Sequence, residues 1–310
     1  MNKQYLTVLG LTRALLFVSL TLSSVPSLAK TELRHNSLLG LRANPSGLAL
    51  KTTAQLRMGL YESDSKLFAQ NFVAPTMQLT ISPANTKVGA GLIVQPLSVL
   101  AVYGEAVGIY YFGSFHRLQS FPVLTDDHSK EAQLERSAQD LNYAAAGLQL
   151  VVGGRFQMKA GPLALVASAR GIWQDFRINE QDLFFYESEL DILAPDRGWV
   201  FHSDIDAVYF WGEDLILGMR HTYVSPQYPQ EFEATEPRPK PNHRLGPLFG
   251  WKLRAKSDEP ARVEEIMLLG LVNWYLDHTY RAGQTSHRAI PYVAIGLRMS
   301  GELWSVTPSL

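Results

Sequence analysis

Hydrophobic and polar residues alternate with a period of two along most of the chain after residue 49. In residues 50–61, Leu50 and Leu56 fall on one face and Lys51 and Gln55 on the other. Because successive side chains of a β-strand point to opposite faces, this pattern predicts strands with one apolar and one polar face. Eleven such segments occur: residues 50–61, 72–82, 87–95, 98–112, 143–157, 163–174, 199–211, 214–224, 244–254, 263–276 and 289–300.

These segments have the features of membrane-spanning strands. Most run over roughly 10–14 residues, which matches tilted spanning strands better than the shorter strands of globular proteins. A chain that crosses a membrane with strands must close into a barrel, because hydrocarbon cannot satisfy an open sheet edge. Interfacial girdles of aromatic residues are typical of such barrels. Aromatic residues near segment ends are Tyr110, Tyr111, Phe112, Trp173, Trp199, Trp211, Trp274, Tyr275 and Trp304.

The pattern therefore predicts an all-β protein, an antiparallel transmembrane β-barrel. A soluble periplasmic β-sandwich is the alternative, since its strands also alternate between an apolar and a polar face.

The first 29 residues have the pattern of a cleavable signal peptide. A basic start that ends at Arg13 precedes the apolar run 14–22, and Ser27 and Ala29 supply small residues before Lys30. The run is too short to span a bilayer, which takes about 20 residues. We therefore expect export, and an outer-membrane location in a Gram-negative cell.

Connection lengths alternate from residue 98 onward. Long connections at 113–142, 175–198, 225–243 and 277–288 alternate with short ones at 158–162, 212–213 and 255–262. Outer-membrane barrels have short periplasmic turns and longer outer loops, so the last strand should end in the periplasm. This alternation of turns and loops requires an even number of strands if both ends of the barrel chain are periplasmic, and eleven is odd. We predict twelve strands, with ten as the alternative.

The expected division of the chain follows from these boundaries. Residues 1–29 form the signal peptide, 30–49 an N-terminal periplasmic or plug segment, 50–304 the barrel and 305–310 a C-terminal tail. Within the first long loop, Leu134, Ala138 and Leu141 have helical spacing, which predicts a short helix over residues 129–142.

Composition and motifs exclude several classes of protein. The chain has no cysteine, and 28 Lys+Arg stand against 29 Asp+Glu. This argues against a disulfide scaffold, a cysteine-ligated metal centre, a lipoprotein and a polybasic nucleic-acid binder. The sequence contains no GxSxG, HExxH or GxxxxGK[ST] motif and no EF-hand loop. The sequence does not identify a catalytic residue, and we expect no cofactor and no metal site.

Two short segments resemble outer-membrane families. Residues 242–246, Asn-His-Arg-Leu-Gly, are similar to part of the Asn-His-x-Ser-Asn-Gly motif of outer-membrane phospholipase A, a twelve-stranded barrel. The resemblance fails at Leu245, near the place of the nucleophilic serine, so acyl transfer lacks its nucleophile. Residues 44–49, Asn-Pro-Ser-Gly-Leu-Ala, resemble an early segment of outer-membrane long-chain fatty-acid transporters, whose N-terminal region plugs a larger barrel. The alternative is a plain turn into the first strand.

The polar strand faces are rich in bases. A narrow lumen with more bases than acids would attract anions. His202, Asp204 and Asp206 share one strand face and could bind a cation or act as an acid/base pair, but pairing with the bases is the simpler role. The predicted lumen-lining bases are Lys51, Arg57, Lys87, Arg155, Arg170, Arg220, Arg244, Lys252, Arg254 and Arg298.

The sequence thus predicts a porin-like transport barrel: a passive or selective conduit, or a structural barrel, with an anion-preferring interior. The alternatives are an outer-membrane hydrolase of lipase or protease type with a site at the outer rim, and a surface interaction protein that uses the long loops. The expected partners are outer-membrane lipids and lipopolysaccharide, the barrel-assembly and periplasmic chaperone machinery and, for a conducting interior, small anionic solutes. No nucleic acid is expected.

Overall fold

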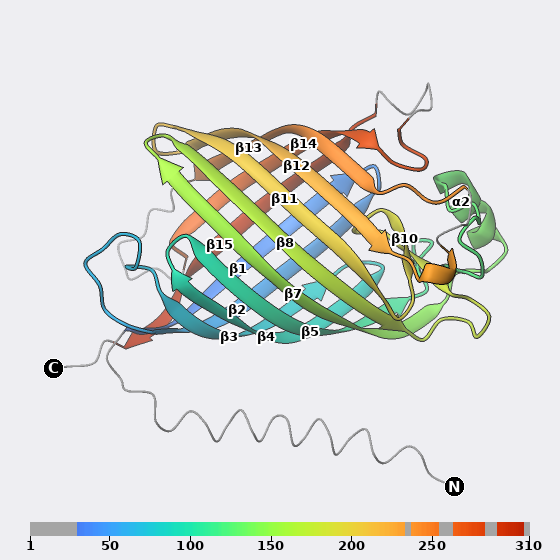
Figure 1. The fold of residues 1–310 in the computed structure, drawn as a ribbon, viewed down its shortest axis with the longest axis horizontal. Coiled ribbons are helices and arrows are strands. Elements are labelled where there is room, and N and C mark those ends of the chain that lie inside the picture. The colour runs from blue at the N-terminus through green and yellow to red at the C-terminus, as the bar shows by residue number, and fades with distance from the viewer. Residues whose placement is uncertain (1–29, 233–236, 254–262, 283–289, 307–310) are drawn as a thin grey trace, which may run out of the picture.

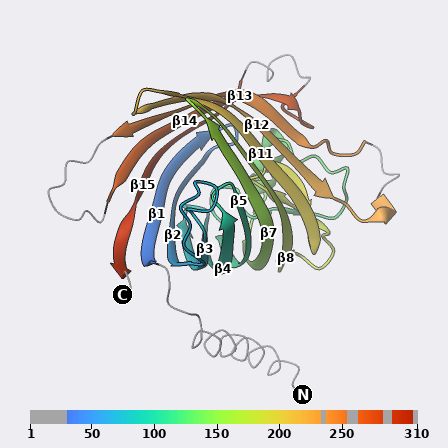
Figure 2. The same cartoon turned by 60° about the vertical axis from the view of Figure 1, so that its left-hand side comes forward.

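The structure, a computed structural model, describes residues 30–232, 237–253, 263–282 and 290–306. Within these ranges, twelve antiparallel strands close into a barrel (Figures 1 and 2). The predicted fold class and strand number are confirmed, and all eleven segments read from the sequence are strands. The barrel strands are β1 Thr31–Ala43, β2 Gly47–Gly59, β3 Phe72–Ile81, β4 Asn85–Leu97, β5 Leu100–Phe112, β7 Ala144–Ala160, β8 Leu163–Phe176, β11 Gly198–Trp211, β12 Leu215–Gln227, β13 Asn242–Leu253, β14 Glu265–Asp277 and β15 Tyr292–Val306.

The strand that the sequence did not reveal is β1. Residues 30–49 were expected to form a periplasmic or plug segment, and this was wrong: β1 pairs with β2 on one side and with β15 on the other. Its alternation is imperfect, because Ser37 lies on the outward face with Leu39 and Leu41, while Leu38 points inward. The barrel also continues to Val306, into the expected tail. The predicted signal peptide and residues 307–310 lie outside the described residues.

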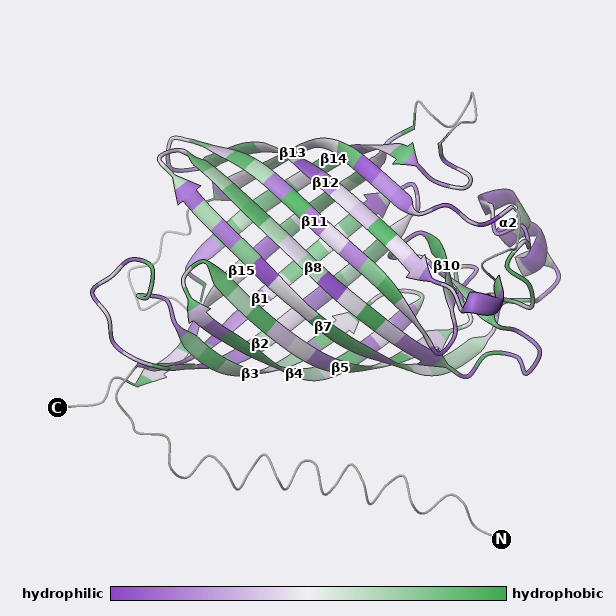
Figure 3. Cartoon of the chain, viewed as in Figure 1, coloured by the Kyte–Doolittle hydropathy of each residue, from purple (hydrophilic) through white to green (hydrophobic). Residues whose placement is uncertain are grey.

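Hydrophobic and hydrophilic residues alternate along the barrel strands (Figure 3), and many large apolar residues are exposed on the outside. On β12 the outward residues Leu217 and Met219 are 37% and 45% exposed, whereas their inward neighbour Thr222 is buried. Outward residues of the adjacent strand β13, such as Phe249 and Trp251, are equally exposed. So large an apolar surface is unfavourable in water and matches the hydrocarbon of a membrane.

The two ends of the barrel differ. β1 begins and β15 ends at one end, where tight turns connect β7 to β8 and β11 to β12. Gly161 and Gly212 occupy these turns with φ of 61° and 67°, which glycine adopts without strain. The longest connections gather at the opposite end, called the loop end below, whereas the connection at residues 60–71 lies at the end with the tight turns (Figure 1). Among the residues that the structure describes, no helix is long and apolar enough to cross a membrane.

The loop end carries the predicted helix. It is α2, Lys130–Ala138, and the Ser129 side chain accepts a hydrogen bond from the Ala132 amide at its start. Three short strands, β6 Ser120–Phe121, β9 Phe184–Glu187 and β10 Ile192–Pro195, form a separate sheet there among the described residues. A single-turn helix, Gln230–Phe232, follows β12.

A face-specific substitution tests the outward register. Leu217 and Phe249 lie opposite each other on β12 and β13. We expect Leu217→Arg or Phe249→Arg to lower the free energy of unfolding by roughly 2–4 kcal/mol, because either places a charge against hydrocarbon. Urea titrations of the refolded barrel in lipid vesicles measure this. Gln55→Arg, on an inward position, is the control and should cost little; equal losses on both faces would contradict the register.

Candidate functional site

The main feature of the interior is a hairpin that enters the barrel from the loop end. The hairpin, residues 184–195, consists of β9, a tip at residues 188–191, and β10. Its strands are short and alternate, so Phe184 and Tyr186 face one way while Phe185 faces the other. Apolar side chains pack against both faces of the hairpin. We call this segment the inserted hairpin.

One face of the inserted hairpin packs on the inner wall of the barrel. Phe185, Ile192 and Ala194 contact inward side chains of five barrel strands, and all are buried. The opposite face packs under the covering loops, where Phe184 meets Tyr228 edge to face at 5.7 Å. The inner wall near the loop end is therefore dry. Its inward apolar residues in this cluster are Val107, Ile109, Tyr111, Ala145, Val151, Ile172, Phe176, Val200 and Val224.

The tip of the inserted hairpin reaches strands on the far side of the barrel. Arg42 of β1 donates from Nη1 to the Ser188 carbonyl at 2.7 Å. Lys87 of β4 forms an ion pair of 2.7 Å with Glu189. β1 lies opposite β8 and β11 in the closed order of the sheet, and β4 lies between the two sides, so the tip spans the lumen.

Further hydrogen bonds fix the tip on other sides. Asn242 of β13 donates to the Leu190 carbonyl at 2.8 Å, and Tyr111 of β5 donates to a Glu187 oxygen at 3.3 Å. Glu187 is 1% exposed, and burial raises the pKa of its carboxyl. The tip is thus tied to strands around the circumference of the barrel, and its polar groups have partners.

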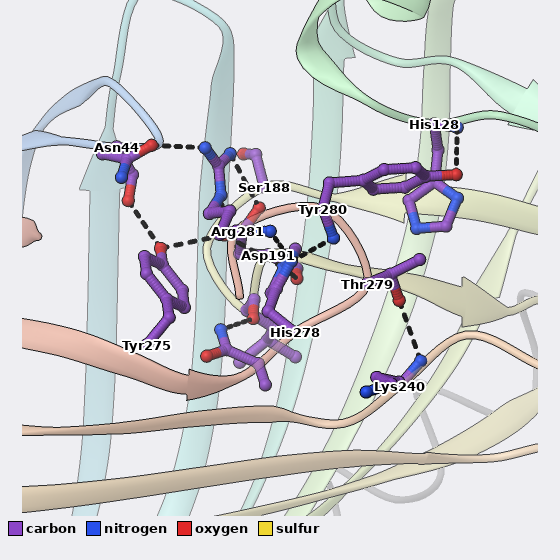
Figure 4. Close-up of polar contacts among 12 residues, drawn as sticks. Asn44, His128, Ser188, Asp191, Lys240, Tyr275, His278, Thr279, Tyr280 and Arg281 are labelled. Atoms are coloured by element: carbon purple, nitrogen blue, oxygen red, sulfur yellow. Dashed lines mark hydrogen bonds and ion pairs between the residues drawn. The ribbon is translucent and has the colours of Figure 1, made fainter. Parts of the chain in front are cut away.

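Asp191 at the tip is the centre of a buried polar network (Figure 4). Its carboxylate is 2.6 Å from Arg281 Nε and 3.3 Å from His278 Nε2, and it accepts hydrogen bonds from Tyr275 at 3.0 Å and Tyr186 at 2.5 Å. Burial alone would raise the pKa of Asp191, but His278 and Arg281 outweigh it and hold that pKa well below its usual range. The carboxylate therefore remains charged at neutral pH and ties the inserted hairpin to β14 and the loop that follows it.

A buried histidine lies in the loops that cover the inserted hairpin. His128 is 4% exposed, its ring is edge-on to Tyr280 at 4.7 Å, and its amide donates to the Tyr280 oxygen at 3.2 Å. Burial lowers the pKa of His128 from 6.5 to about 4. The imidazole is therefore neutral in the closed structure at physiological pH.

The rest of the lumen is polar, and several of its bases are neutralised. Arg220 donates to both Asp206 oxygens, at 2.7 and 2.6 Å. Arg57 is 3.8 Å from Glu32 and stacks on Phe72 at 4.6 Å. Because the two members of each pair lie side by side on neighbouring strands, they neutralise each other's charge without filling the lumen.

Some lumenal bases have no such partner among the described residues: Arg244 contacts aromatic rings and Arg42 binds Ser188, while three others have neither. Lys51, Arg155 and Arg170 are on β2, β7 and β8, and none comes within 4.0 Å of a carboxylate among the described residues. Arg170 also has a buried Nε without a hydrogen bond. We call these three residues the basic belt.

The remaining predicted site residues have different surroundings. Lys87 binds the inserted hairpin, Arg298 binds Asn36 and lies 4.0 Å from Glu265, and Arg244 stacks on Tyr292 at 4.2 Å. Lys252 borders a pocket with Glu264 and Glu265. Arg254 lies outside the described residues.

The predicted acidic cluster does not act as one group. His202 Nε2 and an Asp204 oxygen are 3.8 Å apart, and the other Asp204 oxygen accepts a 2.6 Å hydrogen bond from Thr222. Asp206 instead pairs with Arg220. In the part of the chain that the structure describes, no group of three or more His, Asp or Glu could hold a metal ion.

The acid inventory read from the sequence was incomplete. Strand alternation assigns four acids to inward positions, Asp204, Asp206, Asp214 and Glu265, against the ten predicted bases. The structure adds Glu32 and Glu302, which lie beside Arg34 on β1, and Glu105, which accepts a hydrogen bond from Gln78. Glu32 was missed with strand β1, and Glu302 because β15 is longer than expected. The excess of lumenal bases over lumenal acids is therefore smaller than the ten bases and four acids of the sequence pattern imply. The basic belt is part of that excess.

An open pocket lies at the end of the lumen away from the inserted hairpin. Its volume is about 250 Å³, and Gln55, Arg57, Tyr103, Glu105, Arg155 and Gln157 contribute to its lining. Amide, phenol and guanidinium groups here can donate hydrogen bonds to a polar solute. The basic belt residue Arg155 is part of this lining.

Comparison with known proteins finds solved structures of similar fold and no matching family. No known protein family and no curated protein matches the sequence. Solved structures with a similar fold include the NanC porin (11% identity, 87% of this chain and 100% of that chain, TM-score 0.37), the KdgM porin (7%, 86% and 98%, 0.37) and OccAB1 of Acinetobacter baumannii (8%, 90% and 98%, 0.39). Scores this low carry no argument about activity. The closed barrel and its apolar exterior define the chain as a β-barrel of the outer-membrane class, without an assigned family.

The network around Asp191 predicts how firmly the inserted hairpin is held. Asp191→Ala leaves Arg281 and His278 without their buried partner, which we expect to cost about 3–5 kcal/mol in docking of the hairpin. Limited proteolysis of the folded barrel should then cut within residues 184–195, and mass spectrometry identifies the site. Asp277→Ala is the control, because its pair with Lys240 is more exposed and worth about 0–1 kcal/mol. If Asp191→Ala and wild type resist proteolysis equally, the network does not hold the inserted hairpin in place.

His128 predicts a pH dependence of the covering loops. An imidazole released to water takes up a proton below about pH 6.5, whereas the buried one stays neutral down to about pH 4. The closed state therefore loses stability as pH falls from 6.5 towards 4, by about 1.4 kcal/mol per pH unit. Hydrogen exchange of residues 120–138, corrected for intrinsic rates, measures this opening. His128→Asn should flatten the dependence and His116→Asn, in an exposed loop, should retain it; an unchanged slope in His128→Asn would refute the assignment.

Proposed function

We propose that the protein is an outer-membrane conduit for small anionic solutes, closed at its loop end by the inserted hairpin. The observation that carries the proposal is the basic belt. Lys51, Arg155 and Arg170 project into one lumen from three strands without a carboxylate within 4.0 Å among the described residues. Other lumenal bases, such as Arg220, are neutralised by a close acid.

The electrostatic reasoning favours anions over neutral solutes. Charges in a narrow lumen with low-dielectric walls act over longer distances than in bulk water, because fewer solvent molecules screen them. Glu105 lies close enough to moderate Lys51, and Asp204 to moderate Arg170, but neither pairs with the belt directly. A small carboxylate or phosphate solute would gain hydrogen bonds from the two guanidinium groups of the belt.

The proposal is supported by a pocket that reaches one belt residue, Arg155. The pocket that includes Arg155 opens at the end where the short turns lie, whereas the inserted hairpin spans the lumen at the loop end. Passage through the barrel therefore requires the hairpin to move. The signal-peptide pattern of residues 1–29 and the apolar exterior support an outer-membrane location with the loop end outside.

No observation favours the alternative hydrolase. His243, the histidine of the partial phospholipase-like motif, contacts His221 and Tyr223, and Leu245 supplies no hydroxyl next to it.

Planar bilayer recordings under a salt gradient test the proposal. Wild type should show low and infrequent conductance, while Asp191→Ala, with a loosened hairpin, should open often. The reversal potential of Asp191→Ala should indicate anion preference. Adding Lys51→Gln, Arg155→Gln and Arg170→Gln should move that potential towards zero or reverse its sign, because the unpaired positive charge is gone.

The matched control is Arg197→Gln in the Asp191→Ala background. Arg197 is a strongly exposed loop base, so its loss should leave the reversal potential unchanged. Slower gel migration after boiling verifies that each variant is folded. A folded Asp191→Ala barrel that never conducts, or one that prefers cations, would overturn the proposal.

A further inference from the structure

Two histidines lie together on the outer, lipid-facing wall of the barrel. His221 of β12 alternates with Arg220 and Thr222, which face the lumen, so its side chain faces outward. His243 of β13 is next to the lumenal Arg244 and also faces outward. His243 is the second residue of β13, at the loop end of that strand, whereas His221 is central in β12.

The two imidazole rings converge through the same atom. Nε2 of His221 and Nε2 of His243 are in hydrogen-bond contact, with ring centroids 4.6 Å apart and planes at 88°. The Tyr223 ring packs edge-on against His243 at 5.8 Å. Neither Nδ1 atom has a hydrogen-bond partner among the described residues. In this hydrogen bond one Nε2 carries the proton and the other accepts it. When that proton sits on Nδ1 instead, both Nε2 lone pairs are directed to a common point.

Their surroundings make a purely structural role costly. In register with His221 are Ile205 on β11 and Leu245 on β13, both apolar and outward. Ionisable residues on the lipid face are disfavoured relative to leucine, and where they occur they indicate a functional site. A pair that meets across two strands at this height calls for a ligand that imidazole binds specifically.

We propose that His221 and His243 form a binding site for a divalent transition-metal cation of the Cu²⁺, Zn²⁺ or Ni²⁺ class. Neutral imidazole nitrogen is a favoured ligand of these ions. At a metal–nitrogen distance of about 2.0–2.1 Å and tetrahedral geometry, the two Nε2 atoms need to lie roughly 3.3 Å apart. A small rotation of either ring opens that space.

The pair supplies two ligands, and oxygen atoms complete the coordination. No third histidine or carboxylate joins the pair among the described residues. Water or phosphate oxygens that reach the loop end of β13, beside His243, supply the remaining ligands. This site is on the opposite side of the wall from the lumen, and the inference is independent of the proposed conduit.

Copper provides the most direct test. The full chain, refolded in detergent micelles at pH 7.5, is titrated with Cu²⁺ and followed by electron paramagnetic resonance, which reports nitrogen ligands of the bound ion. We expect His221→Leu and His243→Leu each to lose one Cu²⁺ equivalent relative to wild type. Both should fold, because leucine suits the lipid face, and gel mobility with and without boiling verifies this. Zn²⁺ in large excess should compete for the same equivalent, since imidazole sites bind it more weakly than Cu²⁺.

His35→Leu is the matched control. His35 also faces outward, on β1, and its substitution should leave the equivalent in place. Identical Cu²⁺ stoichiometry and nitrogen signals in wild type, His221→Leu and His243→Leu would overturn the proposal and leave the pair as a hydrogen bond between two side chains.

Discussion

A backbone amide or carbonyl that faces hydrocarbon has no water to bind, so each strand of this chain must pair on both sides. The pairing of β1 with β15 meets that requirement, since it joins the first and last strands over the whole length of β1. Closure then fixes which side chains face lipid and which share the lumen. Leu217 and Phe249 are outward, and Arg220 and Asp206 meet inside, because residues paired across neighbouring strands point to the same face of the sheet.

Closure also creates an interior that has to be filled or hydrated. The chain does both, at different heights. Near the loop end the wall is apolar on its inner side, and the inserted hairpin covers it with residues such as Phe185 and Ile192. Below the hairpin the wall is polar and the basic belt begins. The hairpin thus separates a dry, packed section from a hydrated one, and the Asp191 network controls the contact between its tip and the far wall.

Most of the barrel could be predicted from period-two alternation, because lipid and lumen impose opposite demands on successive residues. β1 could not, since Ser37 faces outward and Leu38 inward, so neither face was recognisably apolar. The sequence did contain a signal for the inserted hairpin, but its residues were assigned to the long connection 175–198. Residues 184–186 are Phe-Phe-Tyr, and Val107 and Ile109 face inward on a strand whose outward face is also apolar, which together indicate apolar burial inside the barrel.

Ion pairing was beyond sequence reasoning, because it depends on register between strands and on loops that return to the lumen. Lys87 was expected to line a lumen, yet it binds Glu189 from a segment about a hundred residues later. The belt residues Lys51, Arg155 and Arg170 could be listed as inward bases from alternation alone. Only the positions of the acids distinguish them from Arg57 and Arg220.

Docking of the inserted hairpin inside the barrel is the feature on which the closed state depends, and the absence of native cysteine makes it directly measurable. Lys87 and Glu189 are replaced together by cysteine, and outer membranes are treated with a short thiol cross-linker. Docking predicts rapid cross-linking of residues 87 and 189, detected as a change in gel mobility after boiling, and no cross-link for a control pair at residues 87 and 140. Failure of the 87–189 pair to cross-link in folded barrels would contradict a hairpin that spans the lumen.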